Sequence, residues 1–392
     1  MNVALISADP EVPVFGNHGC SVHVQEILRA MSKRGFEVDL FAANYGGAVT
    51  QEFSGVRMHS IAVERRERPA ERERAALANN AAVRDLLHRA NRERNYSLIY
   101  ERHALWNFAA MEFAREKDVP GILEINSPSL EERGGQHQLS DRAGAEDAAM
   151  RAFRSATLIR AISQQLAHIL ESHPSARGKV HVIKNAVNAE RFAWAVPSLE
   201  REPNTFVVGF TGELRAAQGL TMLISAFQLV ADALPMTRLV IVGEGEEREA
   251  IEREVAARNL TSHVKFLGGV PPHKIPSLLA SFDVAVAPVP QLNGYYASPL
   301  KVFEYMAAGL PIIASRIGQI EEVLKDGATA ILVPPGDKEA LAQALYDLVE
   351  SPDTRHRLGE AARAQALAAH SWDAALGQIL ELAGIRETAH RA

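Results

Sequence analysis

The sequence predicts an α/β protein with two doubly wound parallel sheets joined by a linker. Short apolar runs alternate with helical patterns from one end of the chain to the other, which is typical of β-α units on parallel sheets. There are twelve such runs, too many for one typical sheet but suited to two sheets of about six strands each. The length of 392 residues also favours two domains over one.

The expected strands are short apolar segments, as strands buried on both faces of a parallel sheet are. In the first half of the chain they lie at 3–6, 38–41, 98–100, 122–125, 157–161 and 180–183. In the second half they lie at 207–210, 239–242, 264–266, 284–287, 311–314 and 330–333. A helix follows the first strand, because Val24, Ile27, Leu28 and Met31 recur at helical spacing, and the tail at 372–385 also has a helical pattern.

The boundary between the predicted domains lies where this alternation is interrupted. The segment 191–203 contains two prolines among mixed polar residues, and a strong strand pattern restarts at Phe206. We therefore expect an N-terminal domain at 1–190, a linker at 191–203 and a C-terminal domain at 204–371, with 372–392 as a terminal segment. Ligands in open α/β sheets bind at the carboxyl ends of the strands, so two such sheets predict a cleft between these ends.

Composition argues against several classes of protein. A net charge of −6 gives no reason to expect nucleic acid as a partner, and the single cysteine, Cys20, rules out an internal disulfide framework. The apolar run at 3–6 is too short for a signal peptide or a membrane span, and no basic segment precedes it. We therefore expect a cytoplasmic protein with no transmembrane segment. Composition leaves open both peripheral contact with a membrane and the oligomeric state.

The segment 298–309 predicts a helix that holds a phosphorylated ligand. Ser298 suits the N-cap and Pro299 the first helical position, and the N-terminus of a helix attracts anions. Lys301 adds a positive charge to the first turn, and Glu304, three residues on, shares its face. This pair suits a nucleotide, because the cation can meet the diphosphate while the carboxylate accepts the ribose hydroxyls. The alternative is an ordinary capped helix with an exposed Lys–Glu pair.

Two glycine-containing loops follow strands in the way that phosphate-binding loops do. One is 16–19 after the first strand, and the other is 211–219 after the strand at 207–210. Arg215 could reach a phosphate, whereas Glu213 would repel one unless it points away. The dinucleotide fingerprint G-x-G-x-x-G is absent from both, and an ordinary tight turn is the alternative for the first.

Other catalytic motifs are missing from the sequence. D-x-D, H-E-x-x-H and C-x-x-C do not occur, so no sequence-local metal site is visible. The nucleophile elbow and the P-loop are also absent, which argues against a hydrolase or a P-loop protein. The charged segment at 64–74 is nearly balanced in sign, which favours a solvated helix with ion pairs over a phosphate loop.

Taken in order, these segments resemble glycosyltransferase family 4 (group 1), and the resemblance covers nearly the whole chain. The matching pieces are the glycine loop at 16–19, the junction at 184–192, the segment 210–219, the strand and loop at 239–245, the helix at 301–309, and Gly318 with Glu321 and Glu322. No single piece decides the matter, but their order and spacing together are specific.

The resemblance implies the GT-B fold, in which two Rossmann-like domains face each other across a cleft. It implies an enzyme of class EC 2.4 that moves a sugar from a nucleotide-diphosphate sugar to a hydroxyl acceptor with retention of configuration. The donor would bind the C-terminal domain, the acceptor would bind the N-terminal domain, and 372–392 would cross back to the latter. Family members usually need no metal, so neither a metal nor another cofactor is expected. The implied reaction is a front-face displacement assisted by the donor diphosphate.

The resemblance also assigns the donor site residue by residue: Gly19, Gly212, Arg215, Gly243, Val270, Tyr296, Ser298, Pro299, Leu300, Lys301 and Glu304. The chain departs from the family at three of the matched positions. Tyr296 stands where the first glutamate of the E-x7-E motif is usual, and Glu213 and Gln218 replace the two cations that usually grip the diphosphate. Lys301 would have to compensate, together with Arg215 and backbone N–H groups.

In the N-terminal domain, Asn126 takes the place of the histidine that family members often carry. The catalytic residues expected from the resemblance are Lys301, Glu304, His103 and Asn126, and the acceptor-binding residues are Glu101, Arg102 and Glu124. A structural role is the alternative for His103.

Two other functions fit the same sequence. A nucleotide-sugar epimerase or a sugar phosphorylase can be built on the same two-domain plan. A catalytically impaired nucleotide-sugar-binding protein is also consistent with the losses at positions 126, 213, 218 and 296. The nucleotide base, the sugar and the acceptor cannot be read from the sequence.

Overall fold

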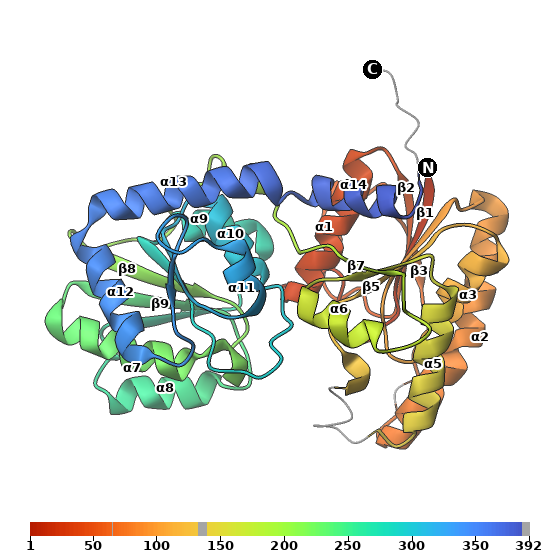
Figure 1. The fold of residues 1–392 in the computed structure, drawn as a ribbon, viewed down its shortest axis with the longest axis horizontal. Coiled ribbons are helices and arrows are strands. Elements are labelled where there is room, and N and C mark those ends of the chain that lie inside the picture. Colours follow the sequence, from red (N-terminus) through yellow and green to blue (C-terminus); the bar gives the residue numbers. More distant parts are fainter. Residues whose placement is uncertain (65, 132–138, 386–392) are drawn as a thin grey trace. The chain divides into compact units, whose positions relative to one another are not determined.

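The computed structural model describes residues 1–64, 66–131 and 139–385, which form two compact units of the α/β class (Figure 1). Unit 1 comprises Met1–Gly16, Cys20–Lys184 and Asp373–Ala392, and unit 2 comprises Asn17–Gly19 and Asn185–Trp372. Each unit is built on one parallel sheet with helices on both faces, which confirms the predicted fold class.

The sheet of unit 1 has seven parallel strands in the order β3-β2-β1-β4-β5-β6-β7. The chain order reverses between β1 and β4, and ligands of doubly wound sheets bind at the carboxyl ends of the strands at such a point. The strands are β1 Asn2–Ser7, β2 Glu37–Ala42, β3 Arg57–Ser60, β4 Leu98–Arg102, β5 Gly121–Ile125, β6 Leu158–Ala161 and β7 Val180–Val182.

The helices of unit 1 cover both faces of this sheet. In Figure 1, α2, α3 and α5 form one layer, while α1 and α14 lie on the other side. Val24, Ile27, Leu28 and Met31 of α1 are all buried, as their spacing predicts. The bounds are α1 Gly19–Lys33, α2 Pro69–Arg94, α3 Ala109–Glu116, α5 Arg142–Ser155, α6 Gln164–Glu171 and α14 Trp372–Leu382, with a 3-10 turn η1 at Gln51–Phe53.

The sheet of unit 2 has six parallel strands in the order β10-β9-β8-β11-β12-β13, with its reversal between β8 and β11. The strands are β8 Phe206–Thr211, β9 Thr237–Val242, β10 Val264–Gly268, β11 Val284–Ala287, β12 Ile312–Ser315 and β13 Ile331–Val333. The helices are α7 Leu220–Ala233, α8 Arg248–Ala257, α9 Ile275–Leu279, α10 Leu300–Ala307, α11 Gly318–Val323, α12 Lys338–Glu350 and α13 Pro352–Ala369. Short 3-10 turns are η2 Ala189–Phe192, η3 Ala216–Gln218 and η4 Pro272–Lys274.

Unit 2 has a hydrophobic core on each face of its sheet. Along β8, Phe206, Val208 and Phe210 pack with α7 and α12, whereas Val207 packs with α10 and α13. Successive side chains of a strand point to opposite faces, and here both faces are covered, so every position is apolar or small. This explains why the strands read as unbroken apolar runs in the sequence.

The predicted strands and the observed ones differ at one place. All twelve predicted segments overlap strands, but β3 was not predicted. Its sequence, Arg-Met-His-Ser, contains a single apolar residue, and its two end residues are exposed because the strand lies at the edge of the sheet. Pairing with the backbone of β2 makes it a strand, and apolar patterning cannot reveal that. Of the charged segment at 64–74, only 69–74 is helical, because α2 begins at Pro69; the predicted helix is wrong for the described residues before it, and Arg65 lies outside the described residues.

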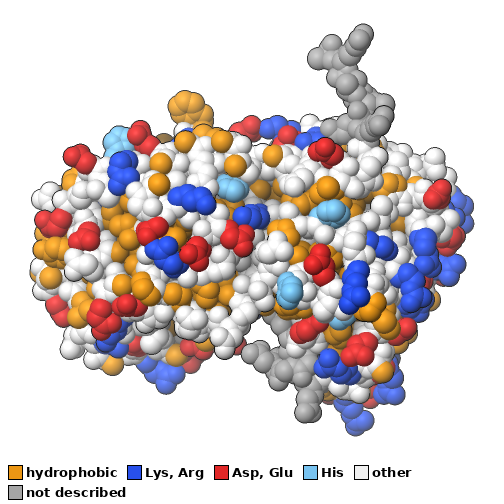
Figure 2. Space-filling model, viewed as in Figure 1, with side chains coloured by type: hydrophobic (Ala, Val, Ile, Leu, Met, Phe, Trp, Pro, Cys, Tyr) orange, Lys and Arg blue, Asp and Glu red, His pale blue; other side chains and the backbone are white. Residues whose placement is uncertain are grey.

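The surface carries charges of both signs. Figure 2 shows acidic and basic side chains interspersed over unit 2, with basic side chains more frequent over the part of unit 1 where α2 lies. Among the described residues, no helix combines the length and the apolar character that a membrane crossing requires. Within the same residues, no group of three or more His, Cys, Asp or Glu side chains is placed to hold a metal ion.

Candidate functional site

The glycines that follow β8 and β9 in unit 2 are hydrogen-bonded to the last residue of the neighbouring strand, at the carboxyl edge of the sheet. The amide of Gly212, after β8, donates to Val242 O at 2.9 Å, and the amide of Gly243, after β9, donates to Gly268 O at 2.8 Å. Gly243 has a φ of +139°, and a Cβ there would lie 1.8 Å from Gly212 O. Only glycine fits such a close approach, so the predicted donor residues Gly212 and Gly243 lie side by side.

Lys301 lies at the same edge of the sheet, on α10, which follows β11. Its Nζ donates to the amide oxygen of Gln218 at 2.6 Å and lies 3.9 Å from the centroid of the Phe210 ring. A Cβ on Gly212 would lie 2.6 Å from Nζ, so the missing side chain makes room for the ammonium. Burial lowers the pKa of Lys301 to about 7, and the carboxylate of Glu304 acts in the opposite direction.

The start of α10 differs from the prediction. The N-cap is Pro299 rather than Ser298, and the first helical residue is Leu300 rather than Pro299. The reason is that Ser298 is bound elsewhere: its hydroxyl accepts a hydrogen bond from the Asn185 amide at 3.2 Å, and its carbonyl accepts one from Asn185 Nδ2 at 2.9 Å. Lys301 is therefore the second residue of the helix. The amide of Val302 donates to Pro299 O at 3.1 Å, whereas the amides of the two residues before it precede the first helical hydrogen bond and can face an anion.

Glu304 lies one turn further along α10 and is partly buried. The next residue, Tyr305, anchors the helix to the end of β8, because its buried hydroxyl accepts a hydrogen bond from the Thr211 amide at 2.8 Å. Arg215, the other predicted phosphate cation, forms an ion pair with Glu213 at 2.7 Å and is 60% exposed. The structure therefore places Arg215 beside the carboxylate that we expected to repel a phosphate.

The remaining predicted donor residues lie in flanking loops. Val270 follows β10 and packs against the core of unit 2. Tyr296 lies in the loop between β11 and α10 and is partly buried. Gly19 is the first residue of α1 and is grouped with unit 2.

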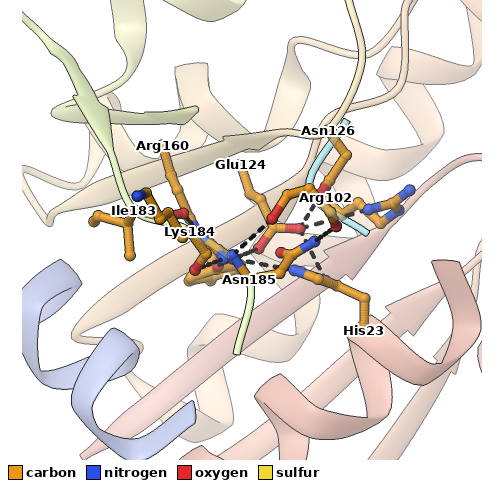
Figure 3. Close-up of polar contacts among 10 residues, drawn as sticks. His23, Arg102, Glu124, Asn126, Arg160, Ile183, Lys184 and Asn185 are labelled. Carbon is orange, nitrogen blue, oxygen red and sulfur yellow. Dashed lines mark hydrogen bonds and ion pairs between the residues drawn. The ribbon is translucent and has the colours of Figure 1, made fainter. Parts of the chain in front are cut away.

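In unit 1 the structure assembles a buried polar cluster around Glu124, which we call the Glu124 cluster (Figure 3). The carboxylate is 1% exposed, at the carboxyl end of β5. Five side chains from neighbouring elements surround it: the Tyr100 hydroxyl, Arg160 Nη1 at 2.6 Å, His23 Nδ1 at 3.2 Å, Asn126 Nδ2 at 2.6 Å and Arg102 Nη1 at 3.5 Å. Despite burial, the nearby positive charges and hydrogen bonds lower the pKa of Glu124 to about 2.

Arg160 is the fully buried cation of this cluster. Its Nε donates to Ile183 O and its Nη2 donates to Lys184 O, each at 3.1 Å, and Nη1 also faces His23 Nε2 at 3.1 Å. Burying a charge is costly unless it is paired and hydrogen-bonded, and Arg160 meets both conditions.

The predicted residues of unit 1 therefore fall into two groups. Arg102, Glu124 and Asn126 come together in the cluster, and Glu124 is enclosed by donors rather than open to an acceptor. Glu101 points to the other face of β4, is 0% exposed and accepts a hydrogen bond from Asn107 at 2.6 Å. This core position argues against the predicted contact between Glu101 and an acceptor.

The backbone amide of His103 donates to Glu124 O at 2.8 Å, and its ring lies 6.0 Å from the ring of Phe153 on α5. Burial and the charge of Arg102 lower the pKa of His103 to about 4. The ring is therefore neutral at pH 7. Its buried Nδ1 has no hydrogen-bond partner among the residues that the structure describes.

Sequence reasoning missed several residues that shape both sites. Arg160 was a detectable signal, because an arginine inside the apolar strand 157–161 must find a partner when the strand is buried. No sequence pattern indicated the other roles, because they depend on neighbours that are distant in the sequence: those of His23, Tyr100 and Phe210, and the contact of Gln218 with Lys301.

Comparison with protein-family models gives two adjacent matches. Residues 18–191 match the model described as Glycosyltransferase Family 4, and residues 194–365 match the model described as Glycosyl transferases group 1. Together the two matches run across both units.

Among curated proteins, the chain is 33% identical over 202 residues to phosphatidyl-myo-inositol mannosyltransferase of Mycobacterium leprae. This alignment covers 51% of the chain and 52% of that protein, so the match spans about half of the relative's length. The chain is 25% identical over 387 residues to D-inositol 3-phosphate glycosyltransferase of Pseudarthrobacter chlorophenolicus, covering 93% of the chain and 90% of that protein.

Solved structures with the same fold include sucrose-phosphate synthase of Thermosynechococcus elongatus, with a TM-score of 0.75, 22% identity and coverage of 97% of this chain and 98% of that one. The Anabaena protein HepE in complex with UDP-glucose gives a TM-score of 0.73 at 19% identity, with the same coverage of both chains.

Proposed function

The chain belongs to the family 4 (group 1) glycosyltransferases of the GT-B fold, and from this premise we propose that it transfers a sugar from a nucleotide-diphosphate sugar to a hydroxyl acceptor with retention of configuration. The observation that carries the proposal is the placement of Lys301. Its ammonium lies beside the glycine turn after β8, at the carboxyl edge of the sheet, with Glu304 one turn deeper in α10.

For the donor, we propose that the diphosphate binds the Lys301 ammonium and the backbone N–H groups at the start of α10. Both carry the positive charge that an anion requires. Glu304 would then accept hydrogen bonds from the ribose hydroxyls. The crystal structure of HepE with UDP-glucose supports this proposal at the level of the fold.

In the proposed reaction, the bond between the sugar C1 and the diphosphate oxygen breaks on the same face on which the acceptor oxygen attacks C1. The proton of the acceptor hydroxyl passes to the departing diphosphate, so charge and atoms balance without a protein base. Lys301 would stabilise the negative charge that develops on the leaving group. Since the chain supplies this cation itself, we propose that the transfer needs no metal ion.

For the acceptor, we propose a polyol that carries a phosphate, bound by unit 1. The names of the two curated relatives specify inositol with an attached phosphate. Arg102, at the end of β4, is the partly exposed cation of the Glu124 cluster, with 16% of its side chain exposed, and it would meet this phosphate. Inositol 3-phosphate and phosphatidylinositol are therefore the first acceptors to assay.

The proposal is tested first by ligand binding and then by turnover. A ligand that binds only the folded protein raises its melting temperature, so a panel of nucleotides and nucleotide sugars should reveal the donor. With that donor, Lys301→Ala should lower turnover about 100-fold to 1,000-fold, because a preorganised charge contact to the leaving group is lost. Lys265→Ala, an exposed lysine on β10, is the matched control and should have no effect.

The outcomes separate the competing functions. Unchanged turnover in Lys301→Ala would overturn the proposed role of this residue. Conversion of the donor without any acceptor would indicate an epimerase, and binding of a nucleotide sugar without transfer to any acceptor would indicate a catalytically impaired binding protein. Transfer that stops on addition of a chelator and resumes with a divalent metal would refute metal independence.

A further inference from the structure

We propose that Gln218 is a positioning residue, which fixes the Lys301 ammonium through its amide oxygen so that the ammonium can meet the donor diphosphate. The inference rests on the proposed function for the identity of the ligand. It also changes the interpretation of position 218. The resemblance indicates that the cation usual at this position is missing, whereas in the structure the glutamine contacts the Lys301 ammonium.

The orientation of the Gln218 amide follows from chemistry. Lys301 Nζ lies 2.6 Å from the side chain of Gln218, and an ammonium can only donate, so the atom that faces it is the carbonyl oxygen. The backbone of Gln218 is fixed as well. It ends η3, its amide donates to Arg215 O at 2.9 Å, and a Cβ on the next residue, Gly219, would lie 2.5 Å from Pro288 O. The amide oxygen that accepts the hydrogen bond is therefore carried by a closely packed turn.

Two further contacts confine the ammonium on other sides. The Phe210 ring offers its π-system at 3.9 Å, and Gly212 leaves the space that a side chain would fill. The charge that acts on the pKa of Lys301 is that of Glu304, on α10 itself, while Glu213 and Arg215 after β8 form an ion pair with each other. Gln218 thus supplies a neutral acceptor to a cation that lies among fixed neighbours.

A neutral acceptor suits this position better than a carboxylate would. An amide oxygen takes one of the three N–H bonds of the ammonium and leaves its net charge intact, so the cation stays attractive to a phosphate. A glutamate would pair with the ammonium and compete with the ligand. The hydrogen bond also favours the charged form, which opposes the effect of burial on the pKa of Lys301.

The first test needs no ligand. The pH dependence of acetylation of Lys301, followed by peptide mass spectrometry, gives the midpoint at which the amine loses its proton. In Gln218→Met, which keeps the length and removes the acceptor, the midpoint should fall by about one pH unit, as expected for loss of a hydrogen bond to a charged group. In Gln218→Glu it should rise. Gln228→Met is the matched control, because Gln228 accepts a hydrogen bond from Arg258 at 2.8 Å elsewhere in unit 2.

The second test measures the affinity for UDP, GDP and ADP by calorimetry at pH 6 and pH 8.5, with circular dichroism to verify folding. Gln218→Met should weaken binding about tenfold at pH 8.5 and less at pH 6, where most of the amine is protonated in the wild type and about half of it in the variant. Gln218→Glu should weaken binding at both values, and Gln228→Met at neither. The inference is overturned if both Gln218 variants keep the wild-type midpoint and affinity while Lys301→Ala loses affinity. If no nucleotide binds the wild type, the proposed function fails, and the acetylation midpoints still decide whether Gln218 fixes Lys301.

Discussion

Replacement of Glu124 by glutamine should destabilise unit 1 in a manner that depends on pH. Glutamine keeps the shape of the side chain and can retain part of the hydrogen bonding, but it removes the charge. Arg160, which is 0% exposed, would then lie in the interior opposite a neutral group. A buried charge that loses its partner is among the costliest defects in a protein.

The magnitude follows from the pKa of Glu124, which lies at about 2 in the folded protein against an ordinary value of 4.5. This fall of between two and three pKa units corresponds to about 3 kcal/mol. The range of about 3 to 5 kcal/mol for a broken buried ion pair includes this value. Because folding depresses the pKa, the contribution is fully present above pH 4.5 and is lost as the pH falls toward 2.

Hydrogen exchange followed by mass spectrometry over β4, β5 and β6 measures the local free energy of opening in unit 1. At pH 7 the Glu124→Gln variant should lose about 3 kcal/mol there, and the difference from the wild type should narrow below pH 4.5. Glu112→Gln is the matched control. It removes a carboxylate that pairs with Arg151 at 2.9 Å but is 25% exposed, so its loss should cost less than about 1 kcal/mol. Equal stability of Glu124→Gln and wild type at pH 7, or a difference that does not change with pH, would refute this reasoning.

Two further predictions concern single residues, one in each unit. Burial raises the pKa of Glu101 to about 8, so its ionisation opposes folding progressively as the pH rises from 4.5 to 8. Glu101→Gln should therefore gain stability over the wild type across that range, by a few kcal/mol at pH 8 in urea unfolding, and a gain that does not grow with pH would contradict the assignment. Gly212→Ala should weaken nucleoside diphosphate binding at least tenfold, because its φ of +143° strains alanine and the new Cβ would lie 2.6 Å from Lys301 Nζ. Gly55→Ala, where no atom lies within 4 Å of the new Cβ, should bind as the wild type does, and equal binding by both variants would exclude a role for the glycine.

Much of the fold could be predicted because it depends on local patterns. Strands buried on both faces produce continuous apolar runs, and β8 reads this way because both of its faces meet hydrophobic cores. The edge strand β3 could not be predicted, because its pairing with β2 leaves no apolar pattern in its side chains. The start of α10 was misplaced by one residue, since local capping preferences favoured Ser298 and could not include its hydrogen bonds with Asn185.

The candidate site was predictable only where the chemistry is contained in one segment. Lys301 and Glu304 lie on one helix, so their spacing alone places them on a common face. The contact between Lys301 and Gln218 spans 83 residues, and that between Arg160 and His23 spans 137, so neither could be inferred without the fold. The resemblance suggested that Glu101 contacts an acceptor, whereas strand alternation turns its side chain toward the opposite face of β4.

Unit 1 is formed by segments from both the beginning and the end of the sequence, which affects how it folds during translation. From Asp373 on, α14, the last helix of the described residues, belongs to unit 1, where Asp373 accepts a hydrogen bond from Arg34 at 2.7 Å and Leu376 and Ile379 are fully buried. Synthesis therefore releases the first 184 residues long before the helix that completes their packing exists. Until then, the apolar surface that α14 covers is exposed on the nascent polypeptide, so chaperone binding during translation should concentrate there. A chain that ends prematurely near residue 371 should aggregate through the same surface.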